Sequence, residues 1–295
     1  MSQQPVKNRF HQFREGRTRI LVNPHFQRWL RELGIEKIGE IVDHAQIDPD
    51  RGGRQGLRLF CPDGSADHRY VIRHYAHGGL LRRLLGDRFF LGSRPFREMR
   101  ITEEIRRRNI PTVQVVASLH HHVWGPFHRG ELITKEIPQS KDLVSFFTSF
   151  GQTPSKEDVA LRREIAQRVG RAVRFMHDRG VYHRDLNLKN LLIEPLNHRN
   201  PRVYIIDFDR SRILEPLPLK YRMKNLLRLN RSSEKWKAQG VNVPYTDKAR
   251  FFRAYAEGDS KIVRAMRDRL KKYRLHARLY RKGWLLDRLL NPSTH

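Results

Sequence analysis

The segment "VYHRDLNLKN" (residues 181–190) places an acid, Asp185, five residues before an amide, Asn190, in a short polar loop. A carboxylate in such a loop could orient a hydroxyl nucleophile, and an amide oxygen could hold a metal ion. A solvated turn that follows a helix would explain the same ten residues. The loop sequence alone does not show whether this is a reactive site or a turn, so the predicted elements around it have to be considered.

A long helix is predicted directly before this loop. Its apolar residues recur at intervals of three and four, which is the period of one helix face. They are Leu161, Ile165, Val169, Val173 and Met176. Ser155 with Asp158 fits a capping box at the start of the helix, and Gly180 fits a left-handed cap at its end. The helix is therefore expected to deliver the chain into the loop.

Two short strands are predicted after the loop, "LLI" (191–193) and "RVYII" (202–206), and the second ends at Asp207. If the strands pair as a hairpin, the start of the first and the end of the second lie at the same end. Asp185, Asn190 and Asp207 are then close together. Two carboxylates and an amide suit Mg²⁺, which takes few protein oxygens and keeps water and phosphate oxygens as further ligands. A strand-end cap explains Asp207 alone but not the joint pattern.

The upstream half is predicted to be mostly sheet. Short strands broken by Gly, Pro and Asp turns are expected over 38–75, a helix over 94–111, and two strands around a Gly-Pro turn over 112–137. Residues 1–37 are basic and weakly patterned and are expected to form an extension. The sequence therefore predicts this extension, a β-rich lobe over 38–137 and a larger helical lobe over 138–295.

The chain carries 59 Lys and Arg residues against 31 Asp and Glu, a formal charge of +28. This excess is expected to attract nucleic acid, a phospholipid surface or a phosphorylated glycolipid. The single cysteine, Cys61, forbids an internal disulfide, so nothing requires an oxidising compartment. The N-terminus lacks the apolar run of a signal peptide, and no stretch approaches the roughly 20 apolar residues that span a bilayer. We therefore expect a cytoplasmic chain whose membrane contact is peripheral.

"HRDLNLKN" followed by "IIDFD" (205–209) resembles the catalytic and metal-binding loops of the protein-kinase-like fold. The resemblance implies an α+β, bilobal fold with a small β-rich N-lobe, a larger helical C-lobe and the active site between them. It implies a catalytic group formed by His183, Arg184 and Asp185, in which Asp185 is the base. It further implies that ATP is the phosphate donor and that Asn190 and Asp207 hold Mg²⁺.

The same resemblance assigns the nucleotide-binding residues to the N-lobe. "YVIR" (70–73) stands where the family has V-A-I-K, so Arg73 is expected to replace the phosphate-binding lysine. Glu98 is its expected ion-pair partner, although a surface glutamate on a helix would look the same. Gly53 and Gly56 of "RGGRQG" fit the last two glycines of G-x-G-x-x-G, and the backbone near Glu136 in "LITKEI" is expected to meet adenine.

Several departures argue against a protein substrate. Asn187 stands where Ser/Thr protein kinases have a lysine, Asp209 replaces the glycine of D-F-G, and no A-P-E segment follows. Instead, four segments resemble the lipopolysaccharide kinase family, and within it the branch that phosphorylates the 4-hydroxyl of 3-deoxy-D-manno-octulosonic acid (Kdo) on lipid A. They are "VIRHYAHGGLLRRLLGDRFF" (71–90), "FREMRITEEIRRRNIPTVQV" (96–115), "GVYHRDLNLKNLLI" (180–193) and "IIDFDRSRI" (205–213).

The resemblance implies an anionic glycolipid as the partner, held at the cytoplasmic face of the inner membrane. Basic stretches such as 73–83 and 264–284 could contact that surface, at about 1 kcal/mol per nearby basic residue. A solvated helix face is the alternative for any one of these arginines. A heptose kinase or protein kinase of the same fold stays open, as does an inactive kinase-like protein that binds nucleic acid. The complete set of Asp185, Asn190 and Asp207 makes nucleic acid the less expected partner.

Overall fold

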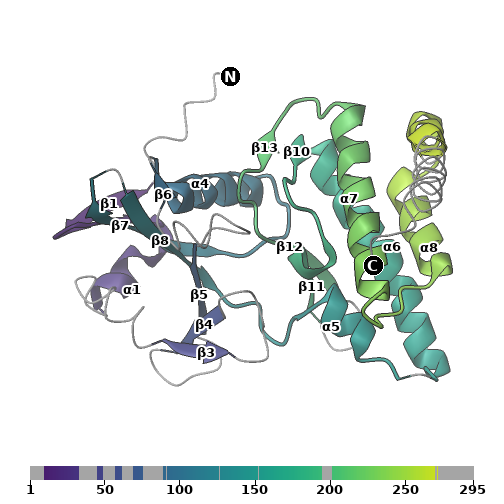
Figure 1. Ribbon diagram of the computed structural model, residues 1–295, viewed down its shortest axis with the longest axis horizontal. Helices are drawn as coiled ribbons and strands as arrows, with labels where there is room; N and C mark the ends of the chain where they lie inside the picture. Colours follow the sequence, from purple (N-terminus) through teal and green to yellow (C-terminus); the bar gives the residue numbers. More distant parts are fainter. Residues whose placement is uncertain are drawn as a thin grey trace, which may run out of the picture.

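The two lobes predicted from the sequence lie side by side in the computed structural model, with a sheet on one side and packed helices on the other (Figure 1). The α+β, bilobal fold is therefore confirmed. The residues described are 10–32, 45–48, 57–61, 69–75, 89–90, 92–125, 127–151, 153–194, 201–269 and 271. Gly53 and Gly56, and most of the basic stretches 73–83 and 264–284, lie outside them.

The N-lobe is built on an eight-stranded sheet with the order β1-β2-β7-β8-β5-β4-β3, and β6 pairs with β8. The strand pairs in the described part of this sheet are antiparallel. The strands are β1 (His11–Glu15), β2 (Thr18–Val22), β3 (Gln46–Asp48), β4 (Leu57–Phe60), β5 (Tyr70–His74), β6 (Phe89–Phe90), β7 (Val115–Trp124) and β8 (Phe127–Lys135). The predicted pair of strands over 112–137 is thus β7 and β8.

The expected N-terminal extension is corrected for residues 10–32, which belong to the N-lobe. β1 and β2 form a hairpin, and β2 pairs with β7. Ile20 and Val22 are buried in a core cluster with residues of β5, β7 and β8. A short 3₁₀ turn (Pro24–Phe26) and α1 (Gln27–Glu32) follow. The apolar run "ILV" is only three residues long and follows an arginine, so basic composition hid the strand.

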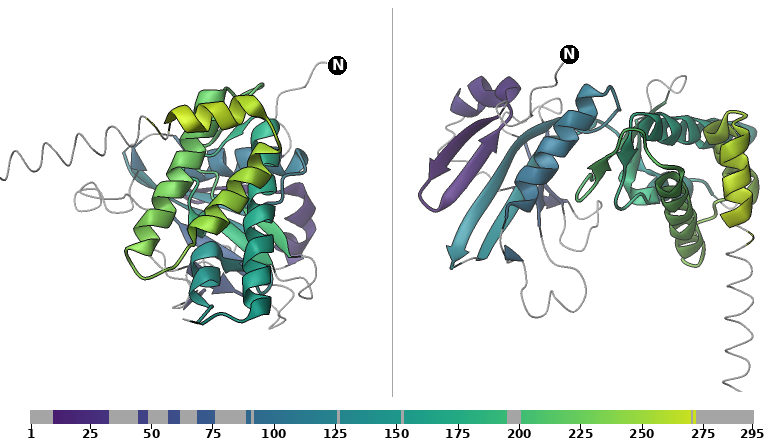
Figure 2. Two further views of the ribbon diagram at one scale, coloured as in Figure 1. Left: turned by 90° about the vertical axis from the view of Figure 1, so that its right-hand side faces the viewer. Right: turned by 90° about the horizontal axis from the view of Figure 1, so that it is seen from above.

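Helix α4 (Arg94–Arg107) connects the two lobes. Ser93 caps it, since its Oγ accepts a hydrogen bond from the backbone N–H of Phe96 at 3.4 Å. Phe96 is buried against the sheet, whereas Ile105, nine residues or about two and a half turns later, is buried in the core of the C-lobe. Seen from above, α4 lies between the strands and the helical lobe (Figure 2). The helix can therefore carry a side chain to the boundary between the lobes.

The C-lobe packs four labelled helices around one hydrophobic core. They are α5 (Leu143–Thr148), α6 (Lys156–Asp178), α7 (Leu219–Lys237) and α8 (Tyr245–Ala256), and residues 260–269 are also helical. The predictions for α6 are confirmed. Ser155 and Asp158 form the capping box, Ile165 and Val173 are fully buried, and Gly180 has a φ of +78°.

The predicted hairpin after the loop is also confirmed. β11 (Leu191–Glu194) pairs antiparallel with β12 (Arg202–Ile205), with Leu191 opposite Ile205. β9 (Lys141–Asp142) pairs with the other edge of β11. β10 (Val181–Tyr182) pairs with β13 (Arg212–Ile213). The loop that contains Asp185 follows β10 directly. This register puts the residues before β11 beside the residues after β12.

Candidate active site

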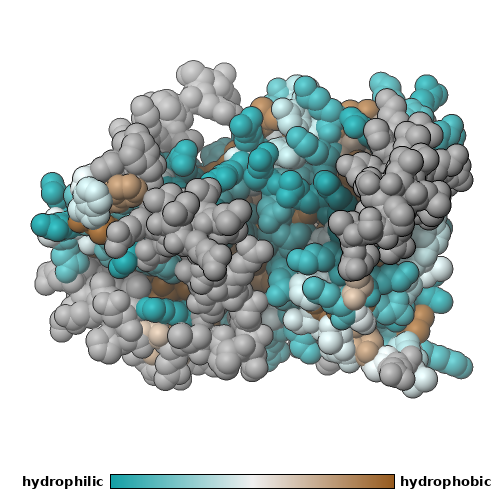
Figure 3. Space-filling view, in the orientation of Figure 1, coloured by the Kyte–Doolittle hydropathy of each residue, from teal (hydrophilic) through white to brown (hydrophobic). Residues whose placement is uncertain are grey.

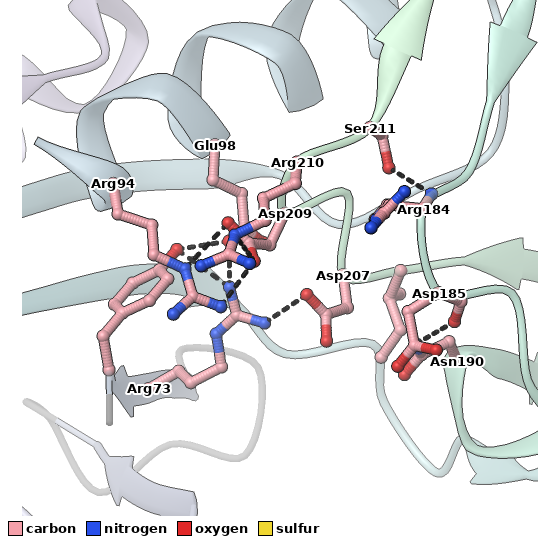
Figure 4. Close-up of polar contacts among 12 residues, drawn as sticks. Arg73, Arg94, Glu98, Arg184, Asp185, Asn190, Asp207, Asp209, Arg210 and Ser211 are labelled. Carbon is pink, nitrogen blue, oxygen red and sulfur yellow. Dashed lines mark hydrogen bonds and ion pairs between the residues drawn. The ribbon is translucent and has the colours of Figure 1, made fainter. Parts of the chain in front are cut away.

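Asp185, Asn190 and Asp207 meet at one end of the β11–β12 hairpin (Figure 4). The backbone N–H of Ile206 donates to the carbonyl of Asn190 at 3.0 Å, which holds Asp207 beside Asn190. The Nδ2 of Asn190 donates to the backbone carbonyl of Asp185 at 2.9 Å. Asp207 has a φ of +64°, a left-handed conformation that Asp tolerates better than most residues. The convergence expected from the sequence is present.

His183 fixes the catalytic loop from beneath. It is fully buried, its Nδ1 accepts from the backbone N–H of Asp185 at 3.1 Å, and its Nε2 faces the carbonyl of Ile206 at 2.9 Å. Because a carbonyl only accepts, Nε2 carries the hydrogen. Burial lowers the pKa of His183, so the ring is neutral near pH 7. His183 therefore ties the loop to the end of β12.

Arg184 is exposed, and its backbone N–H donates to the Oγ of Ser211 at 3.0 Å. Neither the Arg184 side chain nor the His183 ring hydrogen-bonds to the carboxylate of Asp185 in the described part of the chain. Both residues were predicted as members of the catalytic group. In the structure their hydrogen bonds hold the loop, and of these three residues Asp185 is the one with an exposed carboxylate.

The carboxylate of Asp185 is open to solvent, with 59% of the side chain exposed. Its Oδ1 accepts from the Nη1 of Arg228 at 2.8 Å, and its Oδ2 accepts from the Nδ2 of Asn187 at 3.3 Å. Asn187 also donates to the backbone carbonyl of Asp185 at 2.9 Å. Asn187, which stands where Ser/Thr protein kinases have a lysine, thus holds the candidate base. A positive charge reaches the same carboxylate from Arg228 on α7.

Arg73 joins the two lobes at this site (Figure 4). From β5 it pairs with Glu98 of α4, as the sequence predicted, and its Nη1 lies 2.7 Å from the Oδ1 of Asp207. The hydroxyl of Tyr75 bonds to both Arg73 and Glu98. One guanidinium therefore contacts the helix of the N-lobe and the metal-loop acid of the C-lobe.

The charges in this group are set by burial and by one another. Burial raises the pKa of Glu98 to about 7, because the lost hydration of the carboxylate outweighs the attraction of Arg73. For Asp207, burial opposes ionisation, but the attraction and hydrogen bond of the neighbouring Arg73 outweigh it, so the pKa is lowered. Arg73 itself stays cationic. Asp207 is accordingly a carboxylate near neutral pH.

Asn190 and Asp207 fit a bound Mg²⁺. The side-chain nitrogen of Asn190 donates to the carbonyl of Asp185. In the described part of the chain no hydrogen bond to the Oδ1 of Asn190 is present. An ionised Asp207 and this amide oxygen make a small set of hard oxygen donors, of the kind Mg²⁺ takes together with substrate phosphates. Among the described residues, no group of three or more His, Cys, Asp or Glu is placed to hold a metal ion.

Glu136 follows β8 directly and makes internal bonds of its own. The backbone N–H of Glu136 donates to the carbonyl of Arg69 at 2.9 Å, and its Oε2 pairs with the Nε of Arg69 at 3.0 Å. The N–H of Glu136 is thus already used by the backbone of Arg69, beside the ends of β5 and β8. Contact between this segment and adenine stays a prediction, and it would fall to other backbone groups of the segment.

Three side chains at the site were not predicted from the sequence. Tyr75 bridges Arg73 and Glu98, Arg94 pairs with Asp209, and Arg228 contacts Asp185. The segments that resemble the lipopolysaccharide kinases include Tyr75, and that resemblance was the available signal for this residue. Arg228 lies outside those four segments. For Arg94 no local pattern pointed to Asp209.

Comparisons with known proteins identify the family of this chain. The model of the lipopolysaccharide kinase (Kdo/WaaP) family matches residues 53–255. A 3-deoxy-D-manno-octulosonic acid kinase of Vibrio cholerae serotype O1 is 31% identical over 171 residues, which cover 56% of this chain and 65% of that protein. The protein of the same name from Haemophilus influenzae strain PittGG is 27% identical over 182 residues, covering 60% and 70%. The match therefore spans slightly less than two thirds of the Vibrio protein.

A solved structure of WaaP in complex with acyl carrier protein superposes with a TM-score of 0.53. The superposition covers 83% of this chain and 96% of that chain, at 21% sequence identity. At this identity the likeness establishes the fold, which is the bilobal fold seen here.

Proposed function

Because the chain belongs to the lipopolysaccharide kinase (Kdo/WaaP) family, we propose that it transfers a phosphate from ATP to the 4-hydroxyl of a Kdo sugar on a lipid A precursor. The observation that carries this proposal is the convergence of Asp185, Asn190 and Asp207, with Arg73 reaching Asp207 from the other lobe. Relatives with the name of Kdo kinase, at 27% to 31% identity, support the choice of acceptor.

Asp185 is the base in this proposal. Its exposed carboxylate accepts a hydrogen bond from the acceptor hydroxyl and orients the oxygen toward the γ-phosphorus of ATP. It takes the proton as the new O–P bond forms and the bond from the γ-phosphorus to the oxygen of the departing ADP breaks. Asn187 and Arg228 hold the carboxylate in place. Positioning of this kind accounts for much of the rate in phosphoryl transfer, because the protein has little covalent chemistry to perform.

Asn190 and Asp207 would hold Mg²⁺, which neutralises charge on the nucleotide phosphates when it is bound. Arg73 keeps Asp207 ionised and so keeps it a good ligand. Arg73 also presents a permanent positive charge at the lobe boundary, where Glu98 and Tyr75 fix its direction. We infer that Arg73 takes the place of the usual lysine toward the nucleotide phosphates.

The charge of the chain supports an anionic glycolipid as acceptor. The described surface of the helical lobe in Figure 3 is largely hydrophilic, and the whole chain has a formal charge of +28. Among the described helices, none is both long enough and apolar enough to cross a bilayer. We propose that the protein acts as a peripheral protein at the cytoplasmic face of the inner membrane, held there by basic side chains.

The test is to incubate the protein with ATP, Mg²⁺ and a lipid A precursor that carries Kdo, and to measure the mass of the product. One phosphate on the Kdo sugar is expected. Asp185→Asn should abolish transfer and leave ATP binding in place, because the base does not hold the nucleotide. A heptose-bearing acceptor and a peptide pool run in parallel.

If heptose or peptide is phosphorylated and Kdo is not, the protein is a heptose kinase or a protein kinase of the same fold instead. Absence of transfer together with tight, steeply salt-dependent binding of duplex nucleic acid would favour the inactive nucleic-acid-binding alternative instead.

A further inference from the structure

Helix α7 runs along the catalytic loop, and four of its residues contact four loop residues in the same order. The α7 residues are spaced by three, four and four positions, so they lie on one helix face. The pairs are Asn225 with His183, Arg228 with Asp185, Ser232 with Leu188, and Trp236 with Lys189. The helix and the loop are therefore in a defined register.

The pair before Arg228 fixes that register in the core. Asn225 is fully buried, its Oδ1 accepts from the backbone N–H of His183 at 3.2 Å, and its Nδ2 donates to the carbonyl of His183 at 2.6 Å. The same Oδ1 lies 3.1 Å from the Nε2 of His177 on α6. An amide that bonds both backbone groups of one residue sets the position of that residue closely.

The pairs after Arg228 continue the contact. The backbone N–H of Leu188 donates to the Oγ of Ser232 at 3.2 Å, and the Nζ of Lys189 lies 5.1 Å from the ring centroid of Trp236. Arg228 stands between these anchored turns of α7. Its Nη1 contacts the Oδ1 of Asp185 at 2.8 Å. The direction of the guanidinium is therefore determined by a helix that is fixed on both sides of it.

The loop itself has no cation at the position two residues after the base, where Asn187 stands. We propose that Arg228 is the positioning residue of Asp185 and supplies this missing cation from α7. The inference rests on the proposed function of Asp185 as the base. Arg228 on Oδ1 and Asn187 on Oδ2 together fix the rotation of the carboxylate before the acceptor arrives.

Magnitudes favour orientation over stability as the role of this pair. The side chains are 35% and 59% exposed, and exposed ion pairs contribute little to folding, typically about 0 to 1 kcal/mol. Misplacement of a reacting group by about 1 Å can reduce a rate about 100-fold. A change at Arg228 is thus expected to affect catalysis far more than folding.

The experiment compares Arg228→Met and Arg228→Lys with the matched control Arg231→Met, at an exposed arginine of α7 that makes no recorded side-chain contact in the described part of the chain. Steady-state kinetics are measured with the Kdo acceptor, together with ATP affinity and the melting temperature. For Arg228→Met we expect kcat to fall about 10- to 100-fold with an unchanged KM for ATP and an unchanged melting temperature. Arg228→Lys should recover part of kcat, and Arg231→Met should match the wild type.

Wild-type kcat in Arg228→Met would overturn the inference while leaving the proposed function intact. A parallel loss of melting temperature or of ATP affinity would assign Arg228 a structural role and would also overturn it. If the wild-type protein transfers phosphate to no acceptor, the proposed function itself fails, and the assignment of Arg228 fails with it.

Discussion

Arg94, the first residue of α4, forks onto Asp209 with two hydrogen bonds, Nε to Oδ1 at 2.9 Å and Nη2 to Oδ2 at 2.5 Å. The side chains are only 21% and 15% exposed, and bidentate pairs of this kind are among the stronger polar contacts. Asp209 comes two residues after Asp207 and replaces the glycine of D-F-G (Figure 4). The pair therefore ties the start of α4 to the loop that carries the candidate metal ligand.

Asp209→Gly, which restores the D-F-G sequence, is expected to impair this protein. Without Asp209, the partly buried Arg94 loses this bidentate contact, and removing one member of such a contact costs about 1–3 kcal/mol. We expect a lower melting temperature and a higher Mg²⁺ requirement, measured by thermal unfolding and by activity against Mg²⁺ concentration. The control is Arg97→Ala, at an exposed position of α4. If Asp209→Gly has the melting temperature and the Mg²⁺ requirement of the wild type, the contact between Arg94 and Asp209 has no role in either property.

Glu98→Gln is predicted to weaken nucleotide binding. The carboxylate of Glu98 is 2% exposed and contacts Arg73 and the hydroxyl of Tyr75. Glutamine keeps the shape but removes the negative charge that Glu98 carries at a pH above its pKa of about 7, so at such a pH Arg73 would be drawn toward Asp207 alone. Truncating one side of a buried charge pair costs about 2–5 kcal/mol, and we expect at least a tenfold rise in the KM for ATP.

The matched control for this substitution is Glu104→Gln on the same helix, where the carboxylate pairs with Arg108 away from the site. Its KM for ATP should equal that of the wild type. Equal KM values for Glu98→Gln and Glu104→Gln would remove Arg73 and its partner from the nucleotide site.

The parts of the site that the sequence predicted are those that depend on local geometry. The cap at Ser155, the helix period of α6 and the left-handed Gly180 place the loop, and the hairpin register then places Asp207 beside Asn190. Each step involves residues that are near in the chain. Local rules of helix capping and strand pairing were therefore sufficient for the candidate base and metal ligands.

The parts that were missed depend on contacts between distant segments. Arg228 is 43 residues from Asp185, and Arg94 is 115 residues from Asp209. An arginine on a helix surface looks the same in sequence whether it faces solvent or a carboxylate, and this chain is rich in arginine. Only the packing of α7 and α4 against the loops reveals which arginines face the site.

Stability is predicted to fall as the pH falls below about 6.5, with His177 as a main cause. This histidine of α6 is fully buried between the hydroxyl of Tyr255 and the amide of Asn225, and burial lowers its pKa to about 3. Between pH 6.5 and 3 the unfolded chain binds a proton at this position and the folded chain does not. Stability is therefore lost with decreasing pH, by at most about 1.4 kcal/mol per pH unit from this group.

Urea unfolding at a series of pH values checks this prediction. His177→Gln should show a shallower decline of the free energy of unfolding between pH 6.5 and 4 than the wild type. His25→Gln, at an exposed histidine, serves as the control and should follow the wild-type curve. Identical slopes for the wild type and His177→Gln would exclude this histidine as the source of acid sensitivity.

Gly170→Ala tests how closely α6 and α8 pack beneath the loop. A Cβ at Gly170 would lie 2.4 Å from the carbonyl oxygen of Phe251 and 3.1 Å from the Cβ of Ala254, so the backbone of α8 would have to move. Helix propensity alone predicts that alanine gains about 0.5–1 kcal/mol, whereas overpacking predicts a loss of about 1–3 kcal/mol. Because a backbone oxygen cannot rotate away as a side chain does, we expect the loss to prevail.

Thermal unfolding decides the sign for Gly170→Ala. A lower melting temperature is expected, while Gly151→Ala should stay within about 0.5 kcal/mol of the wild type, since apart from its chain neighbours no heavy atom of the described residues lies within 4 Å of a Cβ at that position. A raised melting temperature for Gly170→Ala would mean that α8 sits farther from α6 than described. In that case the hydroxyl of Tyr255 on α8 would be too far away to hold His177. His177 would then no longer be held against Asn225, the residue that contacts the catalytic loop.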